Sequence, residues 1–167
     1  LGVQYGAGRG VVSVSLDQIA DALMAGRILA YAQGFRILGQ AAEEYDWPLD
    51  FARIAQIWRA GCIIRAALLD DIAEAFENSA SHSGQLLEAE AIAAKLQAAL
   101  PGLRAVAGAA LGAGHPAPAL SSAVSFFDSL RIGSGTANII QAQRDFFGRH
   151  GFERLDQEGK HHGPWWG

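Results

Sequence analysis

The chain has 167 residues, half of them apolar, with a net charge of −4 and one cysteine, which suits about one domain with a buried core. Its arginines are spread along the chain and form no basic stripe, so we expect no nucleic-acid partner. No apolar run approaches the roughly 20 residues that cross a bilayer, and the signal-peptide pattern is missing, so no membrane partner is expected.

The single Cys62 cannot form an internal disulfide and stands between apolar neighbours. We interpret it as a buried small residue and not as a nucleophile. Such cysteine usage fits a reducing compartment, so we expect a cytoplasmic protein. Because the chain begins with Leu1 and not with methionine, we also expect a fragment or a processed piece.

The N-terminal third predicts a glycine-rich, flexible lead-in over residues 1–15, followed by one long helix. Ser15 with Gln18 three residues later forms a capping-box pattern. Apolar residues then recur at roughly helical spacing, at Ile19, Leu23, Ile28, Ala32, Phe35, Ile37 and Leu38. A helix is therefore expected over about residues 16–45, and Trp47-Pro48 ends it because the residue before proline avoids the helical region.

The middle of the chain predicts shorter helices separated by turns. Asp50 can cap a helix that Gly61 interrupts, and residues 78–84 are polar and turn-like. Pro101-Gly102 is expected to break the following helical stretch. The helices predicted here carry Phe51 to Trp58 and then cover about residues 62–76, 87–100 and 103–112.

The last third predicts two more helices and a tail. Pro118 can occupy the first turn of a helix that runs to about Leu130. Gly133-Ser134-Gly135 then separates it from a final helix, for which Thr136 is the expected N-cap. No strand alternation or internal repeat competes with these helices, so the predicted fold is all-α, with a long first helix and an irregular C-terminal tail over residues 151–167.

The final helix and the residues after it carry an arginine and a histidine among small, amide and apolar residues. Arg144 offers a planar fork of donors suited to phosphate or carboxylate, and His150 could add a donor near the same anion. Alternatively, the two are cations placed against the negative C-terminal end of the helix, which stabilises it by about 0.3–1 kcal/mol.

Other motifs predict no catalytic, cofactor or metal site. In the glycine run Gly6–Gly10, Val11 stands where the dinucleotide fingerprint needs a third glycine or alanine, and no βαβ unit follows. The carboxylate pairs Glu43-Glu44 and Asp70-Asp71 point about 100° apart on a helix, so neither acts as one acid–base pair. The adjacent His161 and His162 have no further ligand at metal-site spacing.

Six runs of the chain occur in the same order in one enzyme family. They are Tyr31 to Phe35; Ala41 to Trp47; Ile57 to Arg65; Pro116 to Pro118, followed by Ser121 to Ala123 and Phe127-Asp128; Ala137 to His150; and Gly151 to Arg154 with Asp156. From about Ile19 to Trp166 the chain resembles the all-helical C-terminal domain of 6-phosphogluconate dehydrogenase. The resemblance implies a parent enzyme of the pentose phosphate pathway and of gluconate use, which oxidises 6-phosphogluconate with NADP, releases carbon dioxide and yields ribulose 5-phosphate.

The resemblance also implies roles for two residues and a partner. Arg144 matches the arginine that reaches across the family's homodimer to the substrate phosphate, and His150 matches the histidine that joins it from the same subunit. Residues 16–150 would then form the substrate-binding and dimerisation domain. The tail over residues 151–167, with Trp165 and Trp166, would dock on the partner subunit. A tail folded back on its own domain is the alternative.

Two runs depart from the family's pattern. Gly135-Thr136 stands where the family usually has Leu-Pro, and Arg149 to Phe152 replaces a more usual Ala-His-Thr-Tyr. The first change adds backbone freedom before the last helix, and neither removes the arginine or the histidine.

The family's catalytic lysine and nucleotide-binding domain belong to segments upstream of the matched region. This chain has only Lys95 and Lys160, and neither falls in the catalytic motif. We therefore expect no catalytic and no cofactor-binding residue here, and no activity from these 167 residues alone. Two alternatives remain: a non-catalytic helical dimerisation module derived from the family, and a related β-hydroxyacid dehydrogenase, against which the Gln-Arg-Asp run argues.

Overall fold

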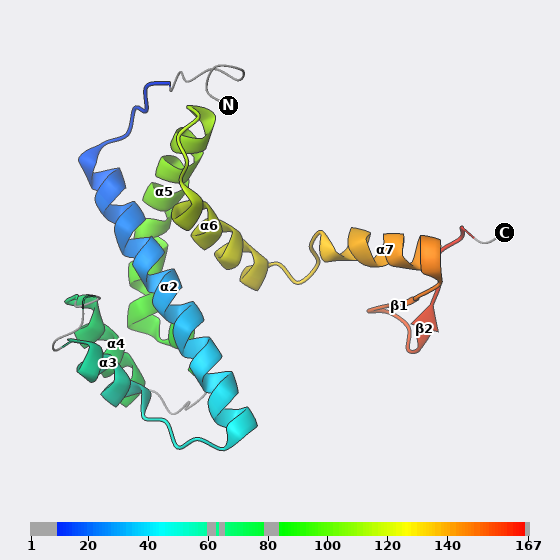
Figure 1. The fold of residues 1–167 in the computed structure, drawn as a ribbon, viewed down its shortest axis with the longest axis horizontal. Coiled ribbons are helices and arrows are strands. Elements are labelled where there is room, and N and C mark those ends of the chain that lie inside the picture. The colour runs from blue at the N-terminus through cyan, green and yellow to red at the C-terminus, as the bar shows by residue number, and fades with distance from the viewer. Residues whose placement is uncertain (1–9, 60–62, 64–65, 79–83, 166–167) are drawn as a thin grey trace. The chain divides into compact units, whose positions relative to one another are not determined.

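The computed structural model describes residues 10–59, 63, 66–78 and 84–165. The predictions for residues 1–9, Gly61, Cys62 and Trp166 lie outside this part of the chain. Its elements, labelled as in Figure 1, are α2 (Leu16–Tyr45), α3 (Phe51–Arg59), α4 (Leu68–Glu77), the 3₁₀ turn η1 (Leu86–Glu88), α5 (Glu90–Gly112), α6 (Pro118–Arg131), α7 (Ala137–Gly148), β1 (Phe152–Glu153) and β2 (Lys160–His161). The predicted all-α class is confirmed.

The chain divides into two compact units, the first ending at Phe127 and the second beginning at Asp128. The predicted helical domain, residues 16–150, therefore includes parts of both. In the first unit, α2 and α5 lie side by side and α3 pairs with α4 (Figure 1). None of the helices in the described ranges has both the length and the apolar character that crossing a membrane requires.

The long first helix begins and ends for local reasons. The Ser15 hydroxyl accepts a hydrogen bond from the Gln18 N–H at 3.1 Å, and the Gln18 side chain accepts one from the Ser15 N–H at 2.8 Å. The predicted capping box is thus confirmed. The helix ends where Asp46 adopts a left-handed backbone with φ 54°. Asp50 also caps as predicted, because its carboxylate accepts from the Arg53 N–H at 2.9 Å.

The core of the first unit is built around Phe35 on α2. Its ring centroid lies 6.0 Å from Phe51, 5.3 Å from Trp58 and 4.8 Å from Phe76, so α2, α3 and α4 share one aromatic cluster. Such pairs add about 0.5–1.5 kcal/mol each beyond the area that they bury. Aliphatic side chains from the helices complete this core at Ile28, Leu29, Leu69, Ile72, Ile92 and Leu103.

The predicted break at Pro101 is wrong, because α5 runs through it. Proline inside a helix loses a hydrogen bond and costs about 3 kcal/mol or more. The buried Leu96 and Leu103 flank Pro101, and a fully buried leucine contributes about 1.5–3 kcal/mol. Burial of the two leucines therefore offsets much of the cost of the proline.

Three other boundaries differ from the prediction. Helix α4 begins at Leu68 instead of near residue 62, which places Asp70 and Asp71 in its first turn, where the helix dipole favours acids. Thr136 precedes α7, but its backbone is already helical and its side chain makes no capping bond. The tail is not wholly irregular, since Phe152–Glu153 pairs antiparallel with Lys160–His161. Strands of two residues are too short to show alternation in a sequence.

We predict that Gly102→Ala destabilises the protein by about 1–3 kcal/mol, because overpacking outweighs the gain of up to about 1 kcal/mol in helix propensity. A Cβ at this position would lie 2.4 Å from the Asp21 Cβ and 2.9 Å from the Gln18 carbonyl oxygen, both on α2. Gly108→Ala, on the same helix with nothing within 4 Å of its Cβ, is the matched control and should stabilise. Urea unfolding followed by circular dichroism compares them, and equal stability of both variants would contradict the close approach.

Candidate anion-binding site

Helix α7 carries Arg144 on its exposed side. The Arg144 Nη1 donates a hydrogen bond to the Gln141 Oε1 at 3.2 Å, one helical turn earlier. Within the described residues, Arg131 and Arg154 are ion-paired with Asp128 and Asp156, whereas the Arg144 guanidinium has only a neutral amide beside it. Arg144 is thus an oriented cation that remains available to an anion.

His150 lies just beyond the end of α7. Arg149 closes the helix in a left-handed conformation with φ 47°, and its N–H donates to the Asp145 carbonyl at 2.9 Å. The His150 ring then turns back over Gly148, because a Cβ built on Gly148 would lie 2.6 Å from the His150 Nε2. His150 and its exposed imidazole therefore sit at the C-terminal end of α7.

Gln141 connects the two predicted site residues. Its Nε2 donates to the Gly151 carbonyl oxygen, and its Oε1 accepts from Arg144. Together with His150, Gln141 also lines a cavity of about 420 Å³, whose other walls are Gly151, Phe152, Glu153 and Lys160. Gln141 thus contacts Arg144 and Gly151, the residue after His150, and the described contacts include none between Arg144 and His150 directly.

Asp145, like Gln141, is a residue of this region that the sequence did not point to. It is fully buried, and its carboxylate accepts four hydrogen bonds. Oδ1 accepts from the Gly151 N–H at 2.8 Å and from the His162 Nδ1 at 2.6 Å, while Oδ2 accepts from the Gly163 N–H and the Trp165 Nε1, both at 2.8 Å. The only signal in the sequence was an acid in an otherwise apolar and amide-rich helix, next to a tail rich in N–H donors.

The environment of Asp145 keeps its carboxyl ionised. Burial by itself would raise the pKa, but the hydrogen bonds from Gly163, Trp165, His162 and Gly151 favour the charged form and together hold the pKa well below its usual range. Asp145 is therefore a carboxylate at neutral pH.

The tail folds back on the helix of its own chain. Besides the hydrogen bond to Asp145, the Trp165 ring meets Phe146 edge-on, with centroids 6.2 Å apart. Gly151 and Gly159 adopt φ values of 73° and 92°, which glycine tolerates, and these turns let β1 and β2 pair. The tail is thus tied to α7 at Asp145 and Phe146, which directly follow Arg144.

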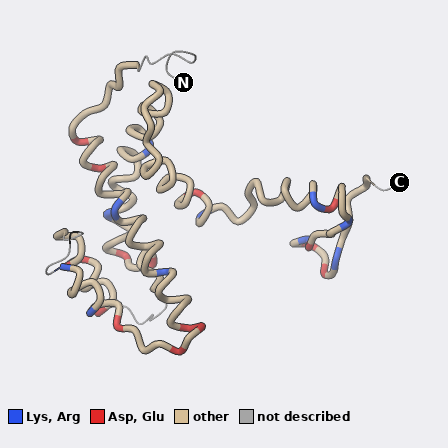
Figure 2. Tube along the Cα trace, viewed as in Figure 1, with Lys and Arg blue, Asp and Glu red and all other residues tan. Residues whose placement is uncertain are grey.

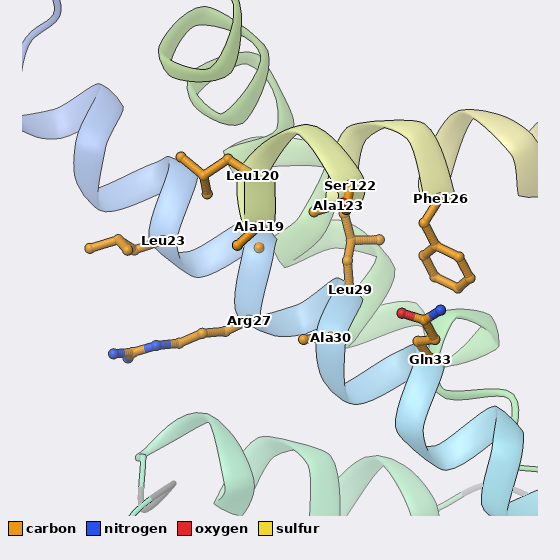
Figure 3. A pocket seen from close by; sticks show the side chains of 11 residues that line it. Leu23, Arg27, Leu29, Ala30, Gln33, Ala119, Leu120, Ser122, Ala123 and Phe126 are labelled. Atoms are coloured by element: carbon orange, nitrogen blue, oxygen red, sulfur yellow. The ribbon is translucent and has the colours of Figure 1, made fainter. Parts of the chain in front are cut away.

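Elsewhere among the described residues, charged side chains form ion pairs such as Arg59 with Asp70 and Lys95 with Asp71. Basic and acidic residues are scattered along the first unit, while the C-terminal end of α7 carries both signs together (Figure 2). The first unit has a cavity of about 280 Å³ between α2 and the start of α6, lined mainly by Leu23, Leu29, Ala30, Leu120, Ala123 and Phe126 (Figure 3). In the residues described, no three His, Cys, Asp or Glu side chains gather in a way that could hold a metal ion.

The fold is an all-helical domain whose last helix exposes Arg144, with His150 two residues beyond the end of that helix. The sequence model described as 6-phosphogluconate dehydrogenase, C-terminal domain, matches residues 9–165. The chain belongs to this family, and the resemblance found in the sequence is confirmed.

Several curated relatives are similar over most of this chain. A decarboxylating 6-phosphogluconate dehydrogenase from Lactococcus lactis subsp. cremoris is 44% identical over 153 residues, and one from Escherichia coli K12 is 43% identical over 152. An NADP(+)-dependent, decarboxylating 6-phosphogluconate dehydrogenase from Bacillus subtilis 168 is also 43% identical over 152 residues. Each comparison covers 90% of this chain and 32% of the relative, so the chain spans about a third of their length.

Because the pKa of Asp145 is lowered in the folded protein, we predict that the stability of the C-terminal unit falls at acid pH. The ionised carboxylate stabilises the folded state fully above about pH 3.9, the pKa of an aspartate in the unfolded chain. This contribution is lost progressively as the pH falls below that value. We expect the difference in urea midpoint between the wild type and Asp145→Asn to be equal at pH 7 and 5 and smaller at pH 3. The NMR signal of the Trp165 indole N–H reports the midpoint, and a gap that does not shrink at pH 3 would contradict this assignment.

Proposed function

We propose that this chain supplies part of the binding site for the phosphate of 6-phosphogluconate, with Arg144 and His150 as the substrate-binding residues. The observation that carries the proposal is the exposed Arg144 guanidinium, oriented by the Gln141 amide and without a carboxylate partner among the described residues. An arginine and a phosphate form a charge-assisted, often bidentate contact, which suits this geometry. His150 would contribute a further hydrogen bond and orient the sugar acid.

The reaction proposed for the parent enzyme is that named for the relatives, oxidative decarboxylation of 6-phosphogluconate, with ribulose 5-phosphate as the product. We propose NADP as its cofactor, since the Bacillus subtilis relative is named as NADP(+)-dependent. The described helices contain no βαβ unit for a dinucleotide, so we assign no residue of this chain to the cofactor. We expect the chain alone to be inactive, and we propose the cytoplasm as the compartment.

We further propose that the chain works as a homodimer. Helix α7 exposes four large apolar side chains, with exposed fractions between 57% and 70%, at Ile139, Ile140, Phe146 and Phe147. Apolar groups gathered on one short helix favour a protein partner over water. In this proposal the partner subunit covers α7 and brings the rest of the substrate site to Arg144, and the tail over residues 151–167 takes part in the contact.

The alternative function is a helical module that keeps this fold for assembly alone. The same exposed apolar residues of α7 favour it. It predicts dimerisation with no dependence of phosphosugar binding on Arg144, so the Arg144→Ala titration below separates the two functions.

Arg144→Ala should weaken binding of 6-phosphogluconate about 10–100-fold, because a hydrogen bond to a charged group contributes about 1.5–3 kcal/mol. Titration of this chain followed by NMR measures the Kd, and the KM of the full-length parent enzyme gives a second measure. Arg53→Ala is the matched control, since Arg53 also donates to a glutamine three residues away on a helix, at 3.4 Å. Equal effects of the two substitutions would contradict the proposed site.

Ile139→Glu should shift the chain from dimer toward monomer, because a charge placed in a covered apolar contact is costly to desolvate. Sedimentation velocity at several protein concentrations measures the shift. Gln97→Glu adds the same charge at an exposed polar position on α5, outside α7 and the tail, and should leave the association unchanged. A monomeric wild type at high concentration would speak against the dimer.

A further inference from the structure

Gly151 is held at both of its backbone polar groups by two side chains of α7. Its N–H donates to the Asp145 Oδ1 at 2.8 Å, and its carbonyl oxygen accepts from the Gln141 Nε2. Gln141 and Asp145 are four residues apart, so they stand on the same face of the helix, one turn apart. His150 directly precedes the glycine that they hold.

The same two side chains reach the rest of the site. Gln141 also accepts from the Arg144 guanidinium, and Asp145 also accepts from His162, Gly163 and Trp165 of the tail. One continuous set of hydrogen bonds therefore runs from the Arg144 guanidinium through Gln141 to Gly151, and from there through Asp145 to the tail. Movement of the Gly151 peptide away from α7 would break bonds on both sides of it.

We propose that Gln141 and Asp145 form a clamp on Gly151 that positions His150 beside Arg144 for one shared anion. This inference rests on the proposed function of those two residues. Gln141 and Asp145 are positioning residues, because they act through Gly151 and do not themselves need to contact the substrate. The clamp names two residues of the anion site that neither motif spacing nor charge had identified.

The charge of Asp145 supports a positioning role over a direct one. A carboxylate repels a phosphate, so an acid adjacent in sequence to Arg144 would weaken an anion site if it faced the ligand. Asp145 is fully buried, and its two oxygens accept from four N–H donors that all belong to residues after α7. Its negative charge is therefore bound by the tail.

An amide cannot replace this carboxylate. Each oxygen of Asp145 accepts two hydrogen bonds, one pair from Gly151 and His162 and the other from Gly163 and Trp165. An asparagine has one oxygen and one NH₂ group, so in either orientation a donor would face one of these pairs. Asp145→Asn therefore releases part of the clamp with almost no change in side-chain volume.

The first test needs no ligand. The NMR signals of the His150 imidazole C–H groups are recorded for the chain and for Asp145→Asn and Gln141→Met, with Asp70→Asn and Gln143→Met as matched controls on exposed sites. We expect the His150 signals to shift and broaden in the two clamp variants and to stay unchanged in the controls. Gln141→Met keeps the buried carboxylate, so it decides the clamp even if Asp145→Asn fails to fold.

The second test is a double-mutant cycle on the Kd for 6-phosphogluconate. Each clamp variant should weaken binding about tenfold in the wild-type background and less than about threefold once His150→Ala is present, because residues that act through one another are not additive. Gly148→Ala, whose Cβ would displace the His150 ring but leave Asp145 untouched, should weaken binding similarly. A purely structural role would instead give equal losses in both backgrounds.

The two proposals fail in different ways. If Arg144→Ala and His150→Ala leave the Kd unchanged, the proposed function is wrong, whereas the His150 signals still decide the clamp. If Arg144→Ala weakens binding but the clamp variants leave the His150 signals unchanged, or their losses are additive with His150→Ala, the clamp is overturned.

Discussion

The carboxylate of Asp145 accepts hydrogen bonds from four N–H groups, which belong to residues 6 to 20 positions later in the chain. Without it, the loop after α7, the turn at Gly163 and the Trp165 indole would each need another acceptor, and unsatisfied buried donors are costly. The C-terminal unit has few other contacts of this kind among its described residues, since α7 buries no other side chain. Together with the glycine turns and the bond from Gln141 to Gly151, this one charge holds the described residues after α7 in place.

Arg144 and Asp145 are neighbours with opposite roles, and helix geometry makes this arrangement possible. Successive residues of a helix point about 100° apart, so one side chain can face the tail while the next faces solvent. Asp145 is buried, and its carboxylate accepts hydrogen bonds from the protein's own N–H donors. Arg144 is exposed and has a neutral amide beside it. The proposed anion site thus lies on the exposed side of α7, while the Asp145 carboxylate on the buried side of the same helix binds the tail.

The helices of the first unit were predictable where local chemistry decides them. The capping box at Ser15, the carboxylate of Asp50 and the turn before Pro48 each act within about four residues, and the structure shows all three boundaries near their predicted places. The prediction failed at Pro101, where the local cost of proline competes with burial of α5 against α2. The α2 residues that α5 contacts lie about 80 positions earlier in the chain. It also failed for the tail, whose paired strands are held by glycine turns and not by a hydrophobic pattern.

The sequence by itself determined the helical class, the family and the two candidate anion-binding residues, because periodicity, caps and family motifs are written in short, contiguous runs. Only the tertiary structure decided that Gln141 and Asp145 hold Gly151 and that the tail returns to α7. Those contacts join residues 6 to 20 positions apart across the end of the helix, and no spacing rule of a helix or strand predicts them. The physical reason is that a buried carboxylate takes its partners from whatever donors the fold brings to it.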